Sequence, residues 1–173
     1  MKPLIFNIKN PVYENTIYLD KDGVLNTALC RENKLSSPRR IEEVRIKKDL
    51  KDIFNFSNKK FNLVIISNQP DLARGLIEEN FLQKNVDKIS KYLPIDQALF
   101  CPHTENMGCH CRKPKTGLIK EFRKLFPYNH KKELFIGDQV SDERCALKLD
   151  IPFVKVDKPL SLHNSIIDFL EFC

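Results

Sequence analysis

Two carboxylates two residues apart, Asp20 and Asp22, stand directly after a short apolar run at residues 17–19, in the sequence Asp-Lys-Asp-Gly. At such a strand end, one carboxylate can act as a nucleophile on phosphorus. The other can protonate the leaving oxygen and then activate water. Gly23 permits the sharp turn that would aim both side chains. An ordinary Asx turn is the alternative, because Asp and Gly are common turn formers.

Three further motifs carry groups suited to a phosphorylated ligand. Ser67 and Asn68 follow the apolar run 63–66, and a hydroxyl with adjacent backbone amides can bind phosphate oxygens. Lys113 can neutralise a phosphoryl group as a point charge, whereas the fork of Arg112 can grip a second anion. Asp138 follows the run 134–136 and suits a hard cation such as Mg²⁺, which prefers oxygen ligands. Each motif is weak alone.

A cluster of sulfur and nitrogen donors lies in the middle of the chain. Cys101 and His103 are followed after five residues by Cys109 and Cys111. Three thiolates and one imidazole suit tetrahedral Zn²⁺ in a closed structural site. A loop of unligated thiols is the alternative, although neighbouring thiols without a partner would be prone to oxidation. His110 stands between two donors, and we expect it to point away. The sequence thus predicts a zinc-binding loop at residues 101–111.

Apolar runs alternate along the chain with stretches of helical periodicity. We expect strands at 17–19, 63–66, 98–100, 134–136 and 152–156, and helices at 49–58, 78–93, 117–126, 141–149 and 160–172. Such alternation favours parallel strands joined by right-handed crossovers, with ligands beyond the carboxyl ends of the strands. Asp20, Ser67 and Asp138 should therefore meet in one crevice. Asp142 is either an acceptor behind the cation or an acid in the first turn of its helix.

Composition limits the class of protein. The chain has 173 residues, of which 42% are hydrophobic and 30% charged, as in a single globular domain with its own core. It shows neither a membrane-spanning run nor a signal peptide, so a cytoplasmic location is expected. The net charge of +6 favours a lysine-rich solvated surface over a nucleic-acid-binding one, because no basic block has interleaved aromatics. A mild positive field also suits a small anionic substrate.

Together the four motifs resemble the haloacid dehalogenase superfamily of phosphatases. The pattern there is Asp-x-Asp-Gly, a Ser or Thr, a Lys, and Gly-Asp with a further Asp. The resemblance spans residues 16–156 and implies an α/β fold: a Rossmann-like three-layer α/β/α sandwich with a mainly parallel five-stranded sheet. It implies Asp20 as nucleophile and Asp22 as acid and base. It also implies Mg²⁺ held by the side chains of Asp20 and Asp138 and by the carbonyl of Asp22.

The segments between the motifs are too short for a large cap domain. We therefore expect one domain over residues 1–173, with an open site closed mainly by loops.

The zinc loop narrows the resemblance. Cys-x-His, then Cys-x-Cys and directly Arg-Lys-Pro, is similar to the branch of histidinol-phosphate and heptose-bisphosphate phosphatases. A metal in this loop would fix the two cations Arg112 and Lys113. We expect Lys113 to touch the transferred phosphate. Arg112 would hold a distal anion or hydroxyl of the leaving group, with Arg74 as a helper. A solvated Arg112 that only supports the zinc loop is the alternative.

The expected activity is hydrolysis of a small sugar phosphate by a monomeric enzyme, most like the heptose 1,7-bisphosphate 7-phosphatases. Histidinol-phosphate phosphatase is the second interpretation. A polynucleotide 3′-phosphatase is disfavoured by the modest charge and the lack of stacking aromatics. A catalytically inactive binding module is disfavoured because Asp20 and Asp22 are both present.

Two segments depart from the heptose pattern and leave the substrate open. Pro70-Asp71 follows Asn68-Gln69 where the heptose enzymes usually have a small residue. The stretch 36–40, Ser-Ser-Pro-Arg-Arg, is unlike the corresponding loop of the best-known members. Both lie where contacts with the leaving group are expected.

Overall fold

A computed structural model describes residues 1–31, 33–47 and 61–156 of the chain. Within these ranges, six strands form one sheet in the order β1-β6-β5-β2-β7-β8. Five of them pair in parallel, and β1 runs antiparallel to β6. The strands are β1 (Leu4–Asn7), β2 (Asn15–Leu19), β5 (Phe61–Asn68), β6 (Gln97–Cys101), β7 (Lys132–Gly137) and β8 (Phe153–Lys155).

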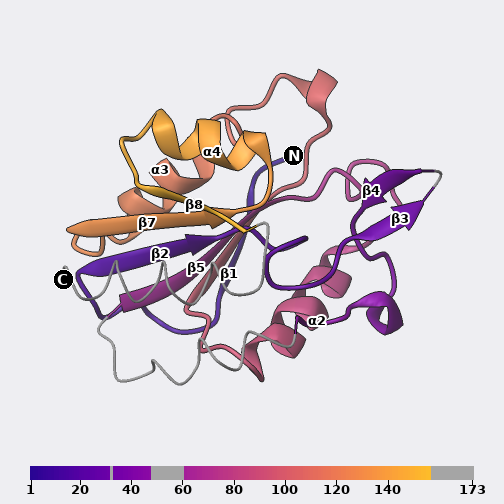
Figure 1. Cartoon of the computed structure of the whole chain (residues 1–173), viewed down its shortest axis with the longest axis horizontal. Coiled ribbons are helices and arrows are strands. Elements are labelled where there is room, and N and C mark those ends of the chain that lie inside the picture. The colour runs from indigo at the N-terminus through magenta and orange to yellow at the C-terminus, as the bar shows by residue number, and fades with distance from the viewer. Residues whose placement is uncertain (32, 48–60, 157–173) are drawn as a thin grey trace.

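Helices cover both faces of this sheet (Figure 1). They are α2 (Glu79–Ser90), α3 (Gly117–Leu125) and α4 (Val140–Leu147). Because successive strand residues point to opposite faces, each strand contributes to two separate cores. Ile17 and Ile65 pack in the core that includes Val86 of α2. Tyr18 and its neighbours on the other face pack with residues of α3 and α4, including Phe122. The predicted α/β/α sandwich is therefore confirmed.

The sheet has one strand more than the five predicted. The additional strand, β1, alternates between half-buried and exposed residues and pairs only at the edge, beside β6. Four residues of mixed burial give too short an alternation to be recognised from the sequence. The helices predicted at 49–58 and 160–172 lie outside the described residues.

A small hairpin, formed by β3 (Leu29–Arg31) and β4 (Lys34–Ser36), was not predicted. Its turn includes Asn33 with a φ of 58°, a left-handed conformation that asparagine tolerates. The hairpin lies on the side to which the parallel strands point (Figure 1), and a 3₁₀ turn at Ile41–Glu43 follows it. In the described part of the chain no helix is both long and apolar enough to span a membrane.

Candidate active site

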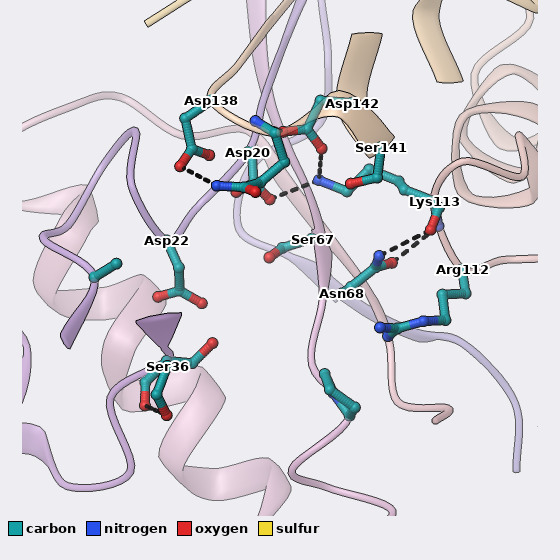
Figure 2. Close-up of a pocket in the computed structure, with 14 residues that line it drawn as sticks. Asp20, Asp22, Ser36, Ser67, Asn68, Arg112, Lys113, Asp138, Ser141 and Asp142 are labelled. Carbon is teal, nitrogen blue, oxygen red and sulfur yellow. Dashed lines mark hydrogen bonds and ion pairs between the residues drawn. The ribbon is translucent and has the colours of Figure 1, made fainter. Parts of the chain in front are cut away.

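The carboxyl ends of the parallel strands bring the sequence motifs together, as the strand-end rule predicted. Asp20 follows β2, Ser67 and Asn68 end β5, and Asp138 follows β7. These side chains line one cavity of about 280 Å³, together with Asp22, Arg112, Lys113 and Asp142 (Figure 2). The cavity joins residues from four separate parts of the chain. A cavity of this size matches the lower end of small-molecule binding sites.

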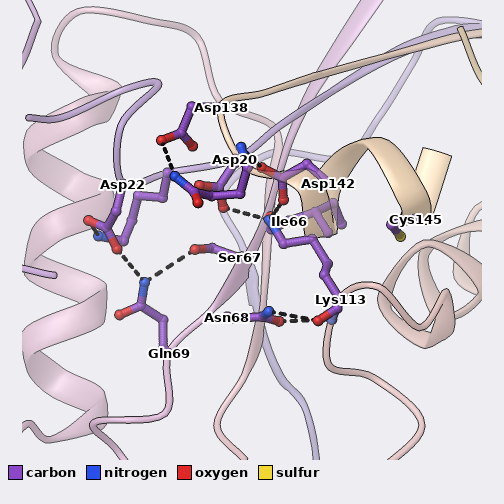
Figure 3. A network of polar contacts seen from close by, with 12 residues as sticks. Asp20, Asp22, Ile66, Ser67, Asn68, Gln69, Lys113, Asp138, Asp142 and Cys145 are labelled. Carbon is purple, nitrogen blue, oxygen red and sulfur yellow. Dashed lines mark hydrogen bonds and ion pairs between the residues drawn. The ribbon is translucent and has the colours of Figure 1, made fainter. Parts of the chain in front are cut away.

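Lys113 lies at the centre of the polar network in Figure 3. Its ammonium contacts the Asp20 carboxylate at 2.6 Å and the Asp142 carboxylate at 2.7 Å. It also donates to the carbonyl of Ile66 at 2.7 Å, and the residue is only 4% exposed. Burial alone would lower the pKa of Lys113, but the two carboxylates raise it well above its usual range. The side chain is therefore a fixed positive charge beside Asp20.

Asp20 has an unusual ionisation. Burial raises the pKa of Asp20 to about 7, and the charge of Asp142 adds to this effect, while Lys113 opposes it. Without further positive charge the site therefore carries more carboxylate than one ammonium can neutralise. A cation or a phosphoryl group bound with a cation would relieve this imbalance.

The donors present fit a hard metal ion. Asp20, Asp138 and Asp142 offer carboxylate oxygens within 4.8 Å of one another. The Oδ1 atom of Asp138 is buried and has no hydrogen-bond partner among the described residues. Burial also raises the pKa of Asp138. Oxygen donors with unbalanced charge are the ligands that Mg²⁺ prefers.

Glycines allow the carboxylates to approach. Gly23 has a φ of +99°, and a Cβ there would lie 2.2 Å from a carboxylate oxygen of Asp138. A Cβ on Gly137 would lie 2.5 Å from the Asp142 side chain. The glycine of each acidic motif therefore makes room for a carboxylate as well as a turn. The sequence left Asp142 between two roles, and its oxygens are used by Lys113 and by the backbone N–H of Gln139.

Asp22 lies apart from the three-carboxylate cluster, held by three donors. Lys21 and Asn26 contact Oδ1 at 2.5 and 2.8 Å, and Gln69 donates to Oδ2 at 2.8 Å. All three are 0% exposed. Burial alone would raise the pKa of Asp22, but the charge of Lys21 and hydrogen bonding by Lys21, Asn26 and Ser37 lower it overall. Sequence reasoning missed the three donors. The one available signal was a lysine between two acids at the end of a buried strand.

Ser67 and Asn68 were both predicted to bind phosphate. Ser67 is buried, and its hydroxyl accepts a hydrogen bond from Gln69 at 3.2 Å. The Asn68 amide is used differently, because it forms a pair of hydrogen bonds with the backbone of Lys113, at 3.0 and 3.1 Å. Asn68 therefore fixes the loop that carries Lys113 to the end of β5.

The predicted zinc donors lie together. Donor atoms of Cys101, His103, Cys109 and Cys111 are all within 4.8 Å of one another. The Sγ atoms of Cys101 and Cys111 are 3.2 Å apart, too far for a disulfide. Hydrogen bonding with Cys101 lowers the pKa of Cys111. This donor set fits tetrahedral zinc, and the exposed His110 lies outside it.

The two arginines predicted to bind substrate are placed differently. Arg112 lines the cavity (Figure 2) and donates to the backbone carbonyl of His103 at 3.2 Å. It therefore contacts the zinc loop as well as the cavity. Arg74 is not among the residues that line the cavity. Its guanidinium instead pairs with Asp71 at 2.8 Å.

Comparison with known proteins assigns the family. The sequence profile of the family described as polynucleotide kinase 3 phosphatase matches residues 20–169. The chain belongs to this family. A D-glycero-alpha-D-manno-heptose-1,7-bisphosphate 7-phosphatase of Campylobacter jejuni is 33% identical over 141 residues, which is 78% of this chain and 77% of the relative. A probable D-glycero-D-manno-heptose-1,7-bisphosphate 7-phosphatase of Thermoplasma acidophilum is 30% identical over 147 residues, covering 80% of this chain and 87% of the relative.

For relatives of a second kind, the region that matches this chain is a smaller share of their own length. The histidine biosynthesis bifunctional protein HisB of Campylobacter jejuni is 29% identical over 144 residues, which is 80% of this chain but 40% of the relative. Among solved structures, a D,D-heptose 1,7-bisphosphate phosphatase from B. bronchiseptica, complexed with magnesium and phosphate, superimposes with a TM-score of 0.71. It is 21% identical and covers 89% of this chain and 98% of that one, so it supports the fold. The chain is thus a haloacid dehalogenase phosphatase of the heptose and histidinol-phosphate branch, as its motifs predicted.

Proposed function

We propose that this enzyme is a magnesium-dependent phosphomonoester hydrolase that acts on a small sugar phosphate, most like D-glycero-D-manno-heptose 1,7-bisphosphate. The observation that carries the proposal is the buried ammonium of Lys113, 2.6 Å from Asp20 at the end of β2. This pair provides a nucleophile and a fixed positive charge for the phosphoryl group. The heptose-bisphosphate phosphatases among the relatives support the choice of substrate class.

The reaction takes two steps. An oxygen of the Asp20 carboxylate attacks phosphorus in line, and the bond from phosphorus to the leaving oxygen breaks. The phosphoryl anion bound nearby favours the protonated form of Asp22, and Asp22 in this form gives a proton to that oxygen, which leaves as an alcohol. Asp22 then takes a proton from water as the water attacks the aspartyl phosphate, releasing inorganic phosphate and restoring Asp20. Lys113 neutralises phosphoryl oxygens in both steps.

The carboxylates at the strand ends support the proposal that the site holds Mg²⁺. Asp20 and Asp138 would hold Mg²⁺ through their side chains and Asp22 through its carbonyl. The metal would offset the carboxylate charge and that of the phosphoryl oxygens. Asp142 keeps Lys113 in place through the ion pair at 2.7 Å. The other oxygen of Asp142, Oδ2, accepts a hydrogen bond from the backbone N–H of Gln139, which fixes the rotamer of the Asp142 side chain.

In the proposed reaction, Arg112 contacts the leaving group rather than the phosphoryl group. Arg112 directly precedes Lys113 in the sequence, and its side chain lines the cavity. A hydrogen bond to the backbone carbonyl of His103 restrains this side chain. We propose that Zn²⁺ in the cluster stiffens this loop, so that Arg112 can meet a distal anion or hydroxyl of the substrate. Arg74 would affect substrate binding only indirectly, through its ion pair with Asp71.

A panel of phosphate esters tests the proposal. Phosphate release should be fastest with the heptose 1,7-bisphosphate and far slower with histidinol phosphate and a 3′-phosphorylated oligonucleotide. Preference for histidinol phosphate would instead support the second candidate, which the HisB relatives favour. Release from none of these esters, with magnesium present and zinc retained, would contradict the proposed function. Asp20→Asn protein, purified in the same way, is the control for contaminating phosphatases.

The environment is also part of the proposal. Three free thiols at one site fit a reducing compartment such as the cytoplasm, where zinc ligation outcompetes disulfides. That the enzyme is a monomer stays a prediction from the sequence.

A further inference from the structure

The two segments that depart from the heptose pattern, residues 36–40 and Pro70-Asp71, contact each other. The guanidinium of Arg39 donates through Nε to Oδ2 of Asp71 at 2.8 Å. Arg74 donates to the other oxygen, Oδ1, also at 2.8 Å. The Asp71 side chain is only 7% exposed. A buried carboxylate therefore joins the loop after the hairpin to the loop after β5.

Both segments also reach the cavity. Ser36, Ser37 and Pro70 line it together with Asp22, and hydrogen bonding by the Ser37 side chain is one of the causes that lower the pKa of Asp22. Figure 2 shows Ser36 near Asp22, on the side of the cavity away from Lys113. This is the side from which the leaving group must be protonated. The joined loops therefore form the wall that the leaving group meets.

Further contacts hold residues 36–40 in one conformation. Arg31 donates to the hydroxyl of Ser36 at 2.8 Å and to the carbonyl of Ser37 at 2.6 Å. Its other nitrogen pairs with Glu43 at 2.5 Å, and Glu43 accepts the backbone N–H of Arg39 at 2.8 Å. These contacts shape the segment itself. The ion pair between Arg39 and Asp71 links the segment to the β5 loop.

Asp71 is ionised at neutral pH. Burial would raise the pKa of this carboxyl, but hydrogen bonds and charge from Arg39 and Arg74 lower it overall. Replacement by asparagine therefore removes a charge and one good acceptor with little change in volume. The asparagine amide can accept a hydrogen bond from one guanidinium, but it cannot neutralise the charges of both arginines.

We propose that Asp71 is a positioning residue for substrate selection, which fixes residues 36–40 as the leaving-group wall by holding Arg39 and Arg74. The inference rests on the proposed function and specifies it. The wall offers the Ser36 and Ser37 hydroxyls, so it suits a hydroxylated leaving group. Asp71 does not touch the phosphoryl group, and the chemistry at Asp20 should not depend on it.

Kinetics with two substrates test this role. For Asp71→Asn, kcat/KM with the heptose 1,7-bisphosphate should fall roughly 10- to 100-fold, mainly through KM, as expected for a lost charged contact. Turnover of acetyl phosphate, whose leaving group is too small to reach the wall, should stay within about twofold of wild type. Asp96→Asn is the matched control, because Asp96 is also a buried carboxylate and lies outside the cavity lining. It should leave the ratio of the two activities unchanged.

A conservative exchange separates positioning from general stability. Arg39→Lys can keep the ion pair and should retain most of the selectivity, whereas Arg39→Gln should behave like Asp71→Asn. Hydrogen exchange should accelerate at residues 33–40 in Asp71→Asn and stay unchanged in β5. Equal losses with both substrates, or no loss with either, would overturn the proposal.

Failure of the proposed function gives a different result. A wild-type enzyme that hydrolyses acetyl phosphate but prefers another ester of the panel would reject the heptose substrate. The same comparison, made with the preferred ester, would still decide the role of Asp71.

Discussion

Removal of the Lys113 ammonium should damage stability and catalysis by separable routes. Lys113→Met keeps most of the length of the side chain and deletes the charge. Asp20 and Asp142, which contact the ammonium at 2.6 and 2.7 Å, would then be buried without a cation. Breaking a buried ion pair on one side costs about 3–5 kcal/mol. For a chain of this size that corresponds to a fall in melting temperature of about 6–20 °C.

A second substitution separates the two effects. In Lys113→Met with Asp142→Asn, one of the two unpaired carboxylates becomes neutral, so about half of the lost stability should return. Turnover should not return, because Asp142→Asn restores no positive charge beside the phosphoryl group. We expect kcat to stay at least roughly 100-fold below wild type in both variants.

The assay is urea unfolding in magnesium-free buffer with zinc retained, together with phosphate release in magnesium. Asp142→Asn alone is the matched control for the loss of one carboxylate. An unchanged urea midpoint in Lys113→Met would show that the buried ion pairs do not stabilise the fold. Recovery of turnover in the double variant would refute the catalytic role of Lys113.

Four further outcomes are expected. Asp20→Asn should abolish turnover and leave the unfolding midpoint close to wild type; substantial residual activity after exclusion of contaminants would reject Asp20 as nucleophile. Arg112→Ala should cost roughly 1–3 kcal/mol of transition-state binding with the sugar substrate and almost nothing with acetyl phosphate; equal effects would assign Arg112 to the zinc loop alone. Elemental analysis should find about one zinc per chain in reduced protein, Cys111→Ser should lower that content, and Zn²⁺ but not Mg²⁺ should restore stability after chelation. Asp96, whose pKa burial raises from 3.8 to about 6, contributes stability below pH 4 that is lost as pH rises through 6. Asp96→Asn should therefore gain about 1–3 kcal/mol relative to wild type between pH 4 and 7 in urea unfolding, and a pH-independent difference would contradict the shift.

The arrangement of the proposed catalytic side chains could be predicted because buried parallel strands leave little freedom. The runs before Asp20, Ser67 and Asp138 are apolar and buried on both faces, so their pairing in one sheet follows from burial. Once the strands are parallel, their ends must lie at one edge. The Cys/His cluster was predictable for a similar reason, since close spacing of donors leaves few ways to place them.

Features that depend on particular side-chain contacts, rather than on the pairing of strands, could not be predicted. Lysine is rarely fully buried, yet Lys21 is 0% exposed because Asp22 and Asn26 surround its ammonium. Asn68 was expected to face phosphate, but its amide meets the backbone of Lys113, 45 positions away. The position of Arg74 could have been questioned from the sequence, because Asp71 lies three residues before it.

The two halves of the cavity are fixed by different kinds of interaction, and this difference bears on how specificity can change. The half around Asp20 and Lys113, where we propose that the phosphoryl group binds, is held by the backbone of buried parallel strands and by the Cys/His cluster, so a substitution there disturbs the core or the cluster. The leaving-group half is held by ion pairs between loops, with Asp71 at 7% exposure and Arg74 at 52%. Exposed arginines can be exchanged at small cost in stability. Substitutions at Arg39, Asp71 and Arg74 can therefore alter the substrate while the geometry around Asp20 and Lys113 stays the same.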